Sequence, residues 1–149
     1  MGVNGQPGAS LRVWRDYFPQ AFVIGADIDK EILFEDERIH TGFMDQTSPV
    51  EIANFFASLA PKYPDQFDVM IDDGLHTFEA AICLFENAFL HLREQGFYII
   101  EDMAFTYIPR FKVYFKECKY SDSISVNYML MSKPNEGNNL IIVRKYAKR

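Results

Sequence analysis

Two short apolar runs in this sequence each end in acidic residues. The first, Phe67 to Ile71, leads into Asp72-Asp73-Gly74-Leu75-His76, and the second, Gly96 to Ile100, leads into Glu101-Asp102. A short aliphatic run bounded by glycine and acid is typical of a strand buried on both faces of a parallel sheet. Ligands of such sheets bind at the carboxyl ends of the strands, so the acids and the histidine are expected at one edge.

Carboxylates crowded at one edge repel one another, so either some are protonated or a cation lies between them. An all-oxygen cluster suits a hard ion such as Mg2+, Mn2+ or Ca2+. His76 is the nearby group whose ordinary pKa lies near neutrality. We interpret the cluster as a metal-assisted catalytic site. The alternative is that these acids are turn residues or helix caps, because Asp-Gly is a common loop dipeptide.

Length, charge and cysteine content restrict the class of protein. A chain of 149 residues predicts one domain. Its net charge of −6 and the lack of a basic tract before residues 144–149 argue against nucleic-acid binding, so a small or neutral substrate is expected. We find no membrane-spanning apolar run and no secretory leader, which predicts a cytoplasmic protein. Cys83 and Cys118 lack ligand spacing, so free thiols are expected.

Helices and strands are predicted to alternate along the chain, which indicates an α/β fold with a doubly wound, mostly parallel sheet. Ser10 and Ser48 are expected to cap the first two helices. The predicted helices run from the Ser10 cap to Phe18, then over Pro49–Leu59, Thr77–Arg93 and Arg110–Glu117. The predicted strands are Ala21–Ala26, Arg38–Phe43, Phe67–Ile71 and Gly96–Ile100, followed by an antiparallel hairpin of Ser123–Met131 and Asn139–Tyr146 joined through residues 133–138.

Five segments carry a resemblance to a known family. They are Gly8–Pro19, Ile24–Asp29, Asp45–Ser48, Phe67–His76 and Tyr98–Met103. In this order they resemble class I S-adenosylmethionine-dependent methyltransferases, and more narrowly the metal-dependent sugar O-methyltransferases of macrolide biosynthesis and the related cephalosporin-hydroxylase group. The resemblance implies a Rossmann-like fold, S-adenosylmethionine and Mg2+ or Mn2+ as cofactors, and a small-molecule hydroxyl acceptor as substrate.

The resemblance also implies a role for each site residue. Asp73, Glu101 and Asp102 would bind the metal, and His76 would be the general base. The cofactor would be held by Gly8 near its methionine end, Asp27 at the ribose hydroxyls, and Asp45 and Gln46 at the adenine, with Asp72 supporting the site. For Asp27, Asp45 and His76, the residues alone leave open ordinary turn or capping roles.

The chain departs from the family pattern at its amino end, where the glycine-rich turn has no apolar strand before it. We therefore expect an amino-terminally truncated domain whose first strand is missing. Three outcomes are expected: a second copy in a homo-oligomer fills the place of the missing strand, the sheet rearranges, or the sequence is a fragment. The competing function is a non-catalytic remnant or binding module that cannot hold the cofactor. A phosphotransfer receiver and a nicotinamide-dependent oxidoreductase are disfavoured, because the lysine of the first and the G-x-G-x-x-G of the second are missing.

Overall fold

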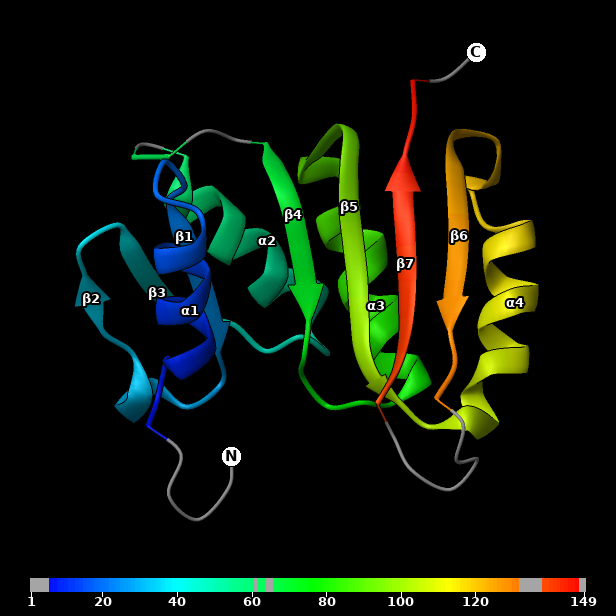
Figure 1. Ribbon diagram of the computed structural model, residues 1–149, viewed down its shortest axis with the longest axis horizontal. Coiled ribbons are helices and arrows are strands. Elements are labelled where there is room, and N and C mark those ends of the chain that lie inside the picture. Colours follow the sequence, from blue (N-terminus) through cyan, green and yellow to red (C-terminus); the bar gives the residue numbers. More distant parts are fainter. Residues whose placement is uncertain (1–5, 61, 64–65, 132–137, 148–149) are drawn as a thin grey trace. The chain divides into compact units, whose positions relative to one another are not determined.

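The computed structural model describes residues 6–60, 62–63, 66–131 and 138–147. The chain divides into two compact units, Met1–Asp45 and Gln46–Arg149. Their strands form two separate sheets, with the order β1-β3-β2 in the first and β4-β5-β7-β6 in the second (Figure 1). The predicted α/β class and the carboxy-terminal antiparallel hairpin are confirmed. A mostly parallel sheet was predicted, whereas two of the five strand pairings among the described residues are parallel and three are antiparallel.

The first unit is a helix and a small sheet. Its elements are α1 (Ala9–Tyr17), β1 (Val23–Asp27), a 3-10 helix (Lys30–Ile32), β2 (Glu35–Asp36) and β3 (Ile39–Phe43). Strands β1 and β3 are parallel, and β2 runs antiparallel to β3. The guanidinium of Arg38 donates to the backbone oxygens of Arg15, Phe18 and Ala21, which ties the end of α1 to the start of β3.

The predicted cap of the first helix was wrong. Gly8, and not Ser10, is the N-cap of α1, and Ser10 lies inside the helix. Gly8 has a left-handed backbone with φ of 74°, and a Cβ there would lie 2.2 Å from the ring of Phe34. Both the backbone conformation and the packing therefore require glycine at this position.

The second unit is a four-stranded mixed sheet with helices. The helices are α2 (Pro49–Leu59), α3 (Phe78–Ala88) and α4 (Ile108–Glu117), with 3-10 turns at Phe89–His91, Phe105–Tyr107 and Ser121–Ser123. The strands are β4 (Phe67–Asp72), β5 (Leu92–Met103), β6 (Ile124–Met129) and β7 (Asn139–Lys145). Helix α2 begins as predicted, because Ser48 Oγ accepts from the backbone N–H of Glu51 and proline occupies the first turn.

Aromatic packing forms the centre of the second unit. Phe85 on α3 is fully buried, and its ring packs edge-to-face on Tyr98 of β5 and Phe115 of α4, with centroids 5.2 and 5.1 Å away. Ile100, Ile141 and Val143 are also fully buried. These contacts hold the sheet against its helices, so the ends of β4 and β5 are attached to a packed core.

The predicted helix Thr77–Arg93 extended too far at its carboxyl end. Helix α3 ends at Ala88, and β5 begins at Leu92 instead of Gly96. Phe89 and Leu92 are both fully buried, so the apolar spacing continues although the backbone has changed from helix to 3-10 turn to strand. The connection of the predicted hairpin over residues 133–138 lies outside the described residues except for Asn138.

None of the helices among the described residues is long and apolar enough to cross a membrane. Cys83, which is partly buried, and Cys118, which is buried, are thiols and not disulfide partners, as predicted.

Candidate metal and catalytic site

Strands β4 and β5 bring the two acidic segments to one edge of the sheet. They are parallel neighbours, with Asp72 opposite Ile100 in the register. Figure 1 shows both strands ending at the same edge of the sheet. The loop Asp73–Thr77 follows β4, while Glu101 and Asp102 are among the last residues of β5. The convergence expected from the sequence is therefore present at this edge.

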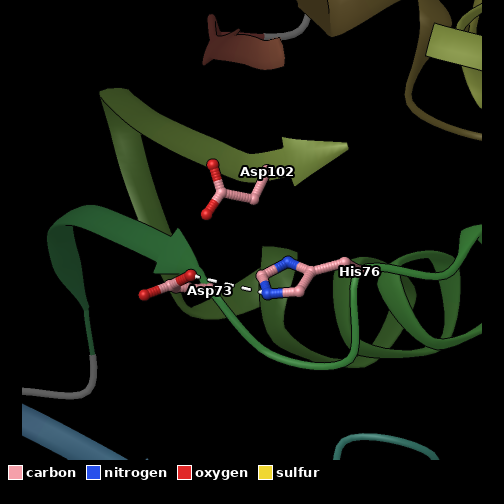
Figure 2. A group of neighbouring side chains, drawn as sticks. All are labelled: Asp73, His76 and Asp102. Atoms are coloured by element: carbon pink, nitrogen blue, oxygen red, sulfur yellow. Dashed lines mark ion pairs between the residues drawn. The ribbon is translucent and has the colours of Figure 1, made fainter. Parts of the chain in front are cut away.

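Three side chains at this edge form a compact group. Asp73, His76 and Asp102 each offer one ligand atom, and these atoms lie within 4.8 Å of one another (Figure 2). Nε2 of His76 is 3.9 Å from Oδ1 of Asp73. The side chains of His76 and Asp73 are 39% and 57% exposed, so a solvent ion or a substrate can reach both.

An unusual backbone conformation aims two of the three side chains. His76 and Asp102 both have φ of 53°, in the left-handed region that residues other than glycine seldom adopt. The pairing of β5 with β7 is also irregular between Ile100 and Met103, as in a β-bulge. Bulges redirect a side chain from its normal alternation, which accounts for the position of Asp102 next to Asp73.

Negative charge accumulates at this edge. Burial raises the pKa of Glu101, and the charges of Asp73 and then Asp102 raise it further, while His76 opposes them. Burial also raises the pKa of Asp72, against hydrogen bonds from Gln46 and the backbone of Gly74. The acids at this edge thus favour a nearby cation or a bound proton.

The donor set fits a divalent cation. Carboxylate oxygens are the ligands that Mg2+ and Mn2+ prefer, and mutual repulsion among them falls when a cation binds. Asp73 and Asp102 are placed to supply such oxygens to one ion. The imidazole of His76 is within the same group, where it can serve either as a ligand or as a base beside the ion.

The structure groups the predicted metal ligands in part. Asp73 and Asp102 come together, but His76 occupies the third place in the group where Glu101 was predicted. Glu101 is adjacent along β5, and its pKa responds to both aspartates. Its role as a ligand stays a prediction.

The predicted cofactor residues of the first unit lie in turns. Gly8 caps α1, and Asp27 ends β1, where its Oδ1 accepts from the backbone N–H of Asp29. Asp45 follows β3 and is partly buried. Roles for Gly8, Asp27 and Asp45 in cofactor binding stay predictions.

Gln46 has contacts that the sequence did not reveal. Its Nε2 donates to Oδ1 of Asp72, and its Oε1 accepts from the backbone N–H of Leu75. These partners are distant along the chain, and no local pattern signals such a contact. The prediction that Gln46 faces the adenine is untested.

Solved structures have the same fold as this chain. The MycE methyltransferase of the mycinamycin biosynthetic pathway, in complex with Mg and SAH, superposes with a TM-score of 0.68 and 25% identity over 93% of this chain and 41% of that chain. A ribosomal RNA methyltransferase from Plasmodium falciparum superposes with a TM-score of 0.73 at 14% identity, over 96% of this chain and 83% of that chain. The chain therefore has the fold of class I S-adenosylmethionine-dependent methyltransferases.

Within that class the chain is similar to macrolide-sugar O-methyltransferases. It is 38% identical over 104 residues to mycinamicin VI 2''-O-methyltransferase of Micromonospora griseorubida, covering 70% of this chain and 25% of the relative. It is 36% identical over 104 residues to demethylmacrocin O-methyltransferase of Streptomyces fradiae, with the same two coverages, 70% and 25%. The resemblance predicted from the sequence is thus confirmed, and the chain spans about a quarter of the length of these relatives. No family model matches the chain.

Proposed function

We propose that this chain is an S-adenosylmethionine-dependent O-methyltransferase, assisted by Mg2+ or Mn2+, that acts on a hydroxyl of a sugar or another secondary metabolite. The observation that carries the proposal is the group of Asp73, His76 and Asp102 at the ends of β4 and β5. The relatives support it, since they are named as O-methyltransferases of macrolide and tetracenomycin sugars. A neighbouring structure is described as a complex with Mg, SAH and mycinamycin VI.

In this proposal Asp73 and Asp102, with Glu101, hold the metal, and His76 is the general base. An alcohol is a poor nucleophile unless its proton is removed as it attacks. A divalent cation held by these carboxylates would lower the pKa of the acceptor hydroxyl and orient it. Nε2 of His76 takes the hydroxyl proton while the oxygen bonds to the methyl carbon. S-adenosylmethionine would supply the methyl group, and the electron pair of the broken carbon–sulfur bond would stay on sulfur in S-adenosylhomocysteine.

Mn2+ titration followed by electron paramagnetic resonance tests the metal assignment. We expect Asp73→Asn and Asp102→Asn each to weaken Mn2+ binding at least about 10-fold, because each removes an anionic ligand. Asp122→Asn is the matched control: it removes the same charge from an exposed residue just before β6, at the opposite edge of the sheet. Unchanged affinity in Asp73→Asn would remove Asp73 from the ligand set.

His76→Ala separates a base from a ligand. If His76 is the base, the variant keeps Mn2+ affinity but loses methyl transfer to a macrolide sugar. If it is a ligand, Mn2+ affinity falls together with turnover, and the proposed role of His76 as general base is wrong. The variant's circular dichroism must match that of the parent chain.

Calorimetry with S-adenosylhomocysteine, with and without Mg2+, tests the enzyme against the competing remnant. Binding in the micromolar range supports the methyltransferase. No heat up to millimolar ligand favours a non-catalytic binding module.

A further inference from the structure

One side-chain amide connects the buried end of β4 to the loop that carries Asp73 and His76. Nε2 of Gln46 donates to Oδ1 of Asp72 at 3.1 Å. Oε1 of the same amide accepts from the backbone N–H of Leu75 at 2.7 Å. Both polar ends of the Gln46 side chain are therefore used by residues on either side of Asp73.

The Asp72 end of this bridge is fixed by burial. Asp72 is the last residue of β4 and is 4% exposed, so its carboxylate cannot turn into solvent. A buried carboxylate requires donors; Gln46 supplies one to Oδ1, while Oδ2 has no hydrogen-bond partner among the described residues. Gln46 is thus anchored on a rigid strand before it contacts the loop.

The loop end of the bridge lies at Leu75. The side chain of Leu75 is 58% exposed, so it contributes little packing that would fix the loop. Gly74 packs directly under the amide: a Cβ at this position would lie 1.7 Å from Oε1 of Gln46. The hydrogen bond to Leu75 N–H and this close approach together define the path of the backbone from Asp73 to His76.

We infer that Gln46 is a positioning residue for the metal site, because its amide fixes the backbone that places the Asp73 carboxylate and the His76 imidazole. The expected effect on metal binding rests on the proposed function. The role of Gln46 in holding the loop backbone does not. Groups that orient metal ligands without touching the metal typically change affinity about 10- to 100-fold when removed. Gln46 meets that description through its contacts with Asp72 and Leu75.

Mn2+ titration of Gln46→Ala tests the consequence. We expect affinity to fall about 10- to 100-fold while the circular dichroism of the chain is retained. Gln95→Ala is the matched control, since it removes another glutamine of the same unit. Gln95 lies near the start of β5, and its Oε1 accepts from Arg144 of β7. We expect its Mn2+ affinity to equal that of the parent. Equal affinity in parent and Gln46→Ala would overturn the inference.

Two further readouts keep the inference testable if the parent chain binds no Mn2+, in which case the proposed function fails first. Amide exchange at Leu75 should be at least about 10-fold faster in Gln46→Ala, and the imidazole resonances of His76 should shift, with neither change in Gln95→Ala. Unchanged exchange and unchanged resonances would overturn the inference without reference to metal.

A second variant covers the case in which Gln46→Ala does not fold. Gln46→Glu keeps an oxygen that can accept from Leu75 N–H but loses the donor to Asp72. We expect Leu75 exchange to rise less than about 10-fold over that of the parent chain, and Mn2+ affinity to fall in the folded protein. Parent-like values for both readouts in Gln46→Glu would contradict a positioning role for the donor half of the bridge.

Discussion

Replacement of Gly74 by alanine should displace the side chain of Gln46 and leave the rest of the unit in place. The added Cβ would lie 1.7 Å from Oε1 and 2.7 Å from Cδ of Gln46, separations that no packed structure tolerates. The atoms in the way belong to the end of a flexible side chain, so the amide can swing aside. Doing so breaks the hydrogen bonds to Asp72 and to Leu75 N–H.

The size of the effect follows from those two bonds. A hydrogen bond between neutral groups contributes about 1 kcal/mol to stability, and one to a charged group about 1.5 to 3 kcal/mol. The Gln46 bridge contains one of each kind when Asp72 is ionised. Gly74→Ala should therefore lower the free energy of unfolding by about 2.5 to 4 kcal/mol, and Gln46→Ala by a similar amount.

The double variant decides whether one contact explains both losses. If Gly74→Ala acts by expelling the Gln46 amide, then Gln46→Ala adds little to it, and the coupling energy of the cycle is about 2 kcal/mol or more. Replacing Gly74 by alanine also reduces the conformational entropy of the unfolded chain. This effect is the same with and without the Gln46 side chain, so it cancels in the cycle. Urea denaturation of the four proteins measures the cycle, and Gln95→Ala in place of Gln46→Ala should give additive losses. Additive losses for Gly74 and Gln46 would refute the reasoning.

Three further expectations concern the core and the site. Phe85→Ala should lower the free energy of unfolding by about 3 to 5 kcal/mol, while Leu90→Ala, 57% exposed, should cost less than about 1 kcal/mol by urea denaturation. Because the pKa of Glu101 is raised above its ordinary value of 4.5, the folded state binds more protons than the unfolded state just above pH 4.5. The free energy of unfolding without metal should therefore fall as the pH rises from 4.5 towards neutrality. The fall should be less steep in Glu101→Gln. The hydroxyl of Tyr98 is buried with no hydrogen-bond partner among the described residues, so Tyr98→Phe should leave stability unchanged or raise it by about 1 kcal/mol; a clear loss in thermal denaturation would contradict this.

Local sequence signals predicted the elements that local chemistry controls. Ser48, Pro49 and Glu51 fixed the start of α2, and the aliphatic run before Asp72 fixed β4. The end of α3 was not predictable, because apolar spacing reports which residues are buried and not the backbone that buries them. Phe89 and Leu92 continue the helical spacing after the helix has ended.

The composition of the site was predictable, but its geometry was not. Acids after two adjacent parallel strands must meet at one edge, which identified Asp73 and Asp102 from the sequence. The position of Asp102 beside Asp73 depends on the irregular pairing of β5 with β7, which involves distant residues. The bridge from Gln46 likewise depends on tertiary contacts that no local pattern encodes.

The positive φ of His76 and Asp102 has a consequence for redesign of this chain. Glycine or asparagine is the residue that backbone preference alone would choose at both positions. A laboratory selection for heat resistance would favour such replacements, and they would remove both the imidazole of His76 and the carboxylate of Asp102. Under the proposed function, thermal stability and catalysis make opposite demands at these two positions, so a stabilised variant of this protein has to gain its stability elsewhere.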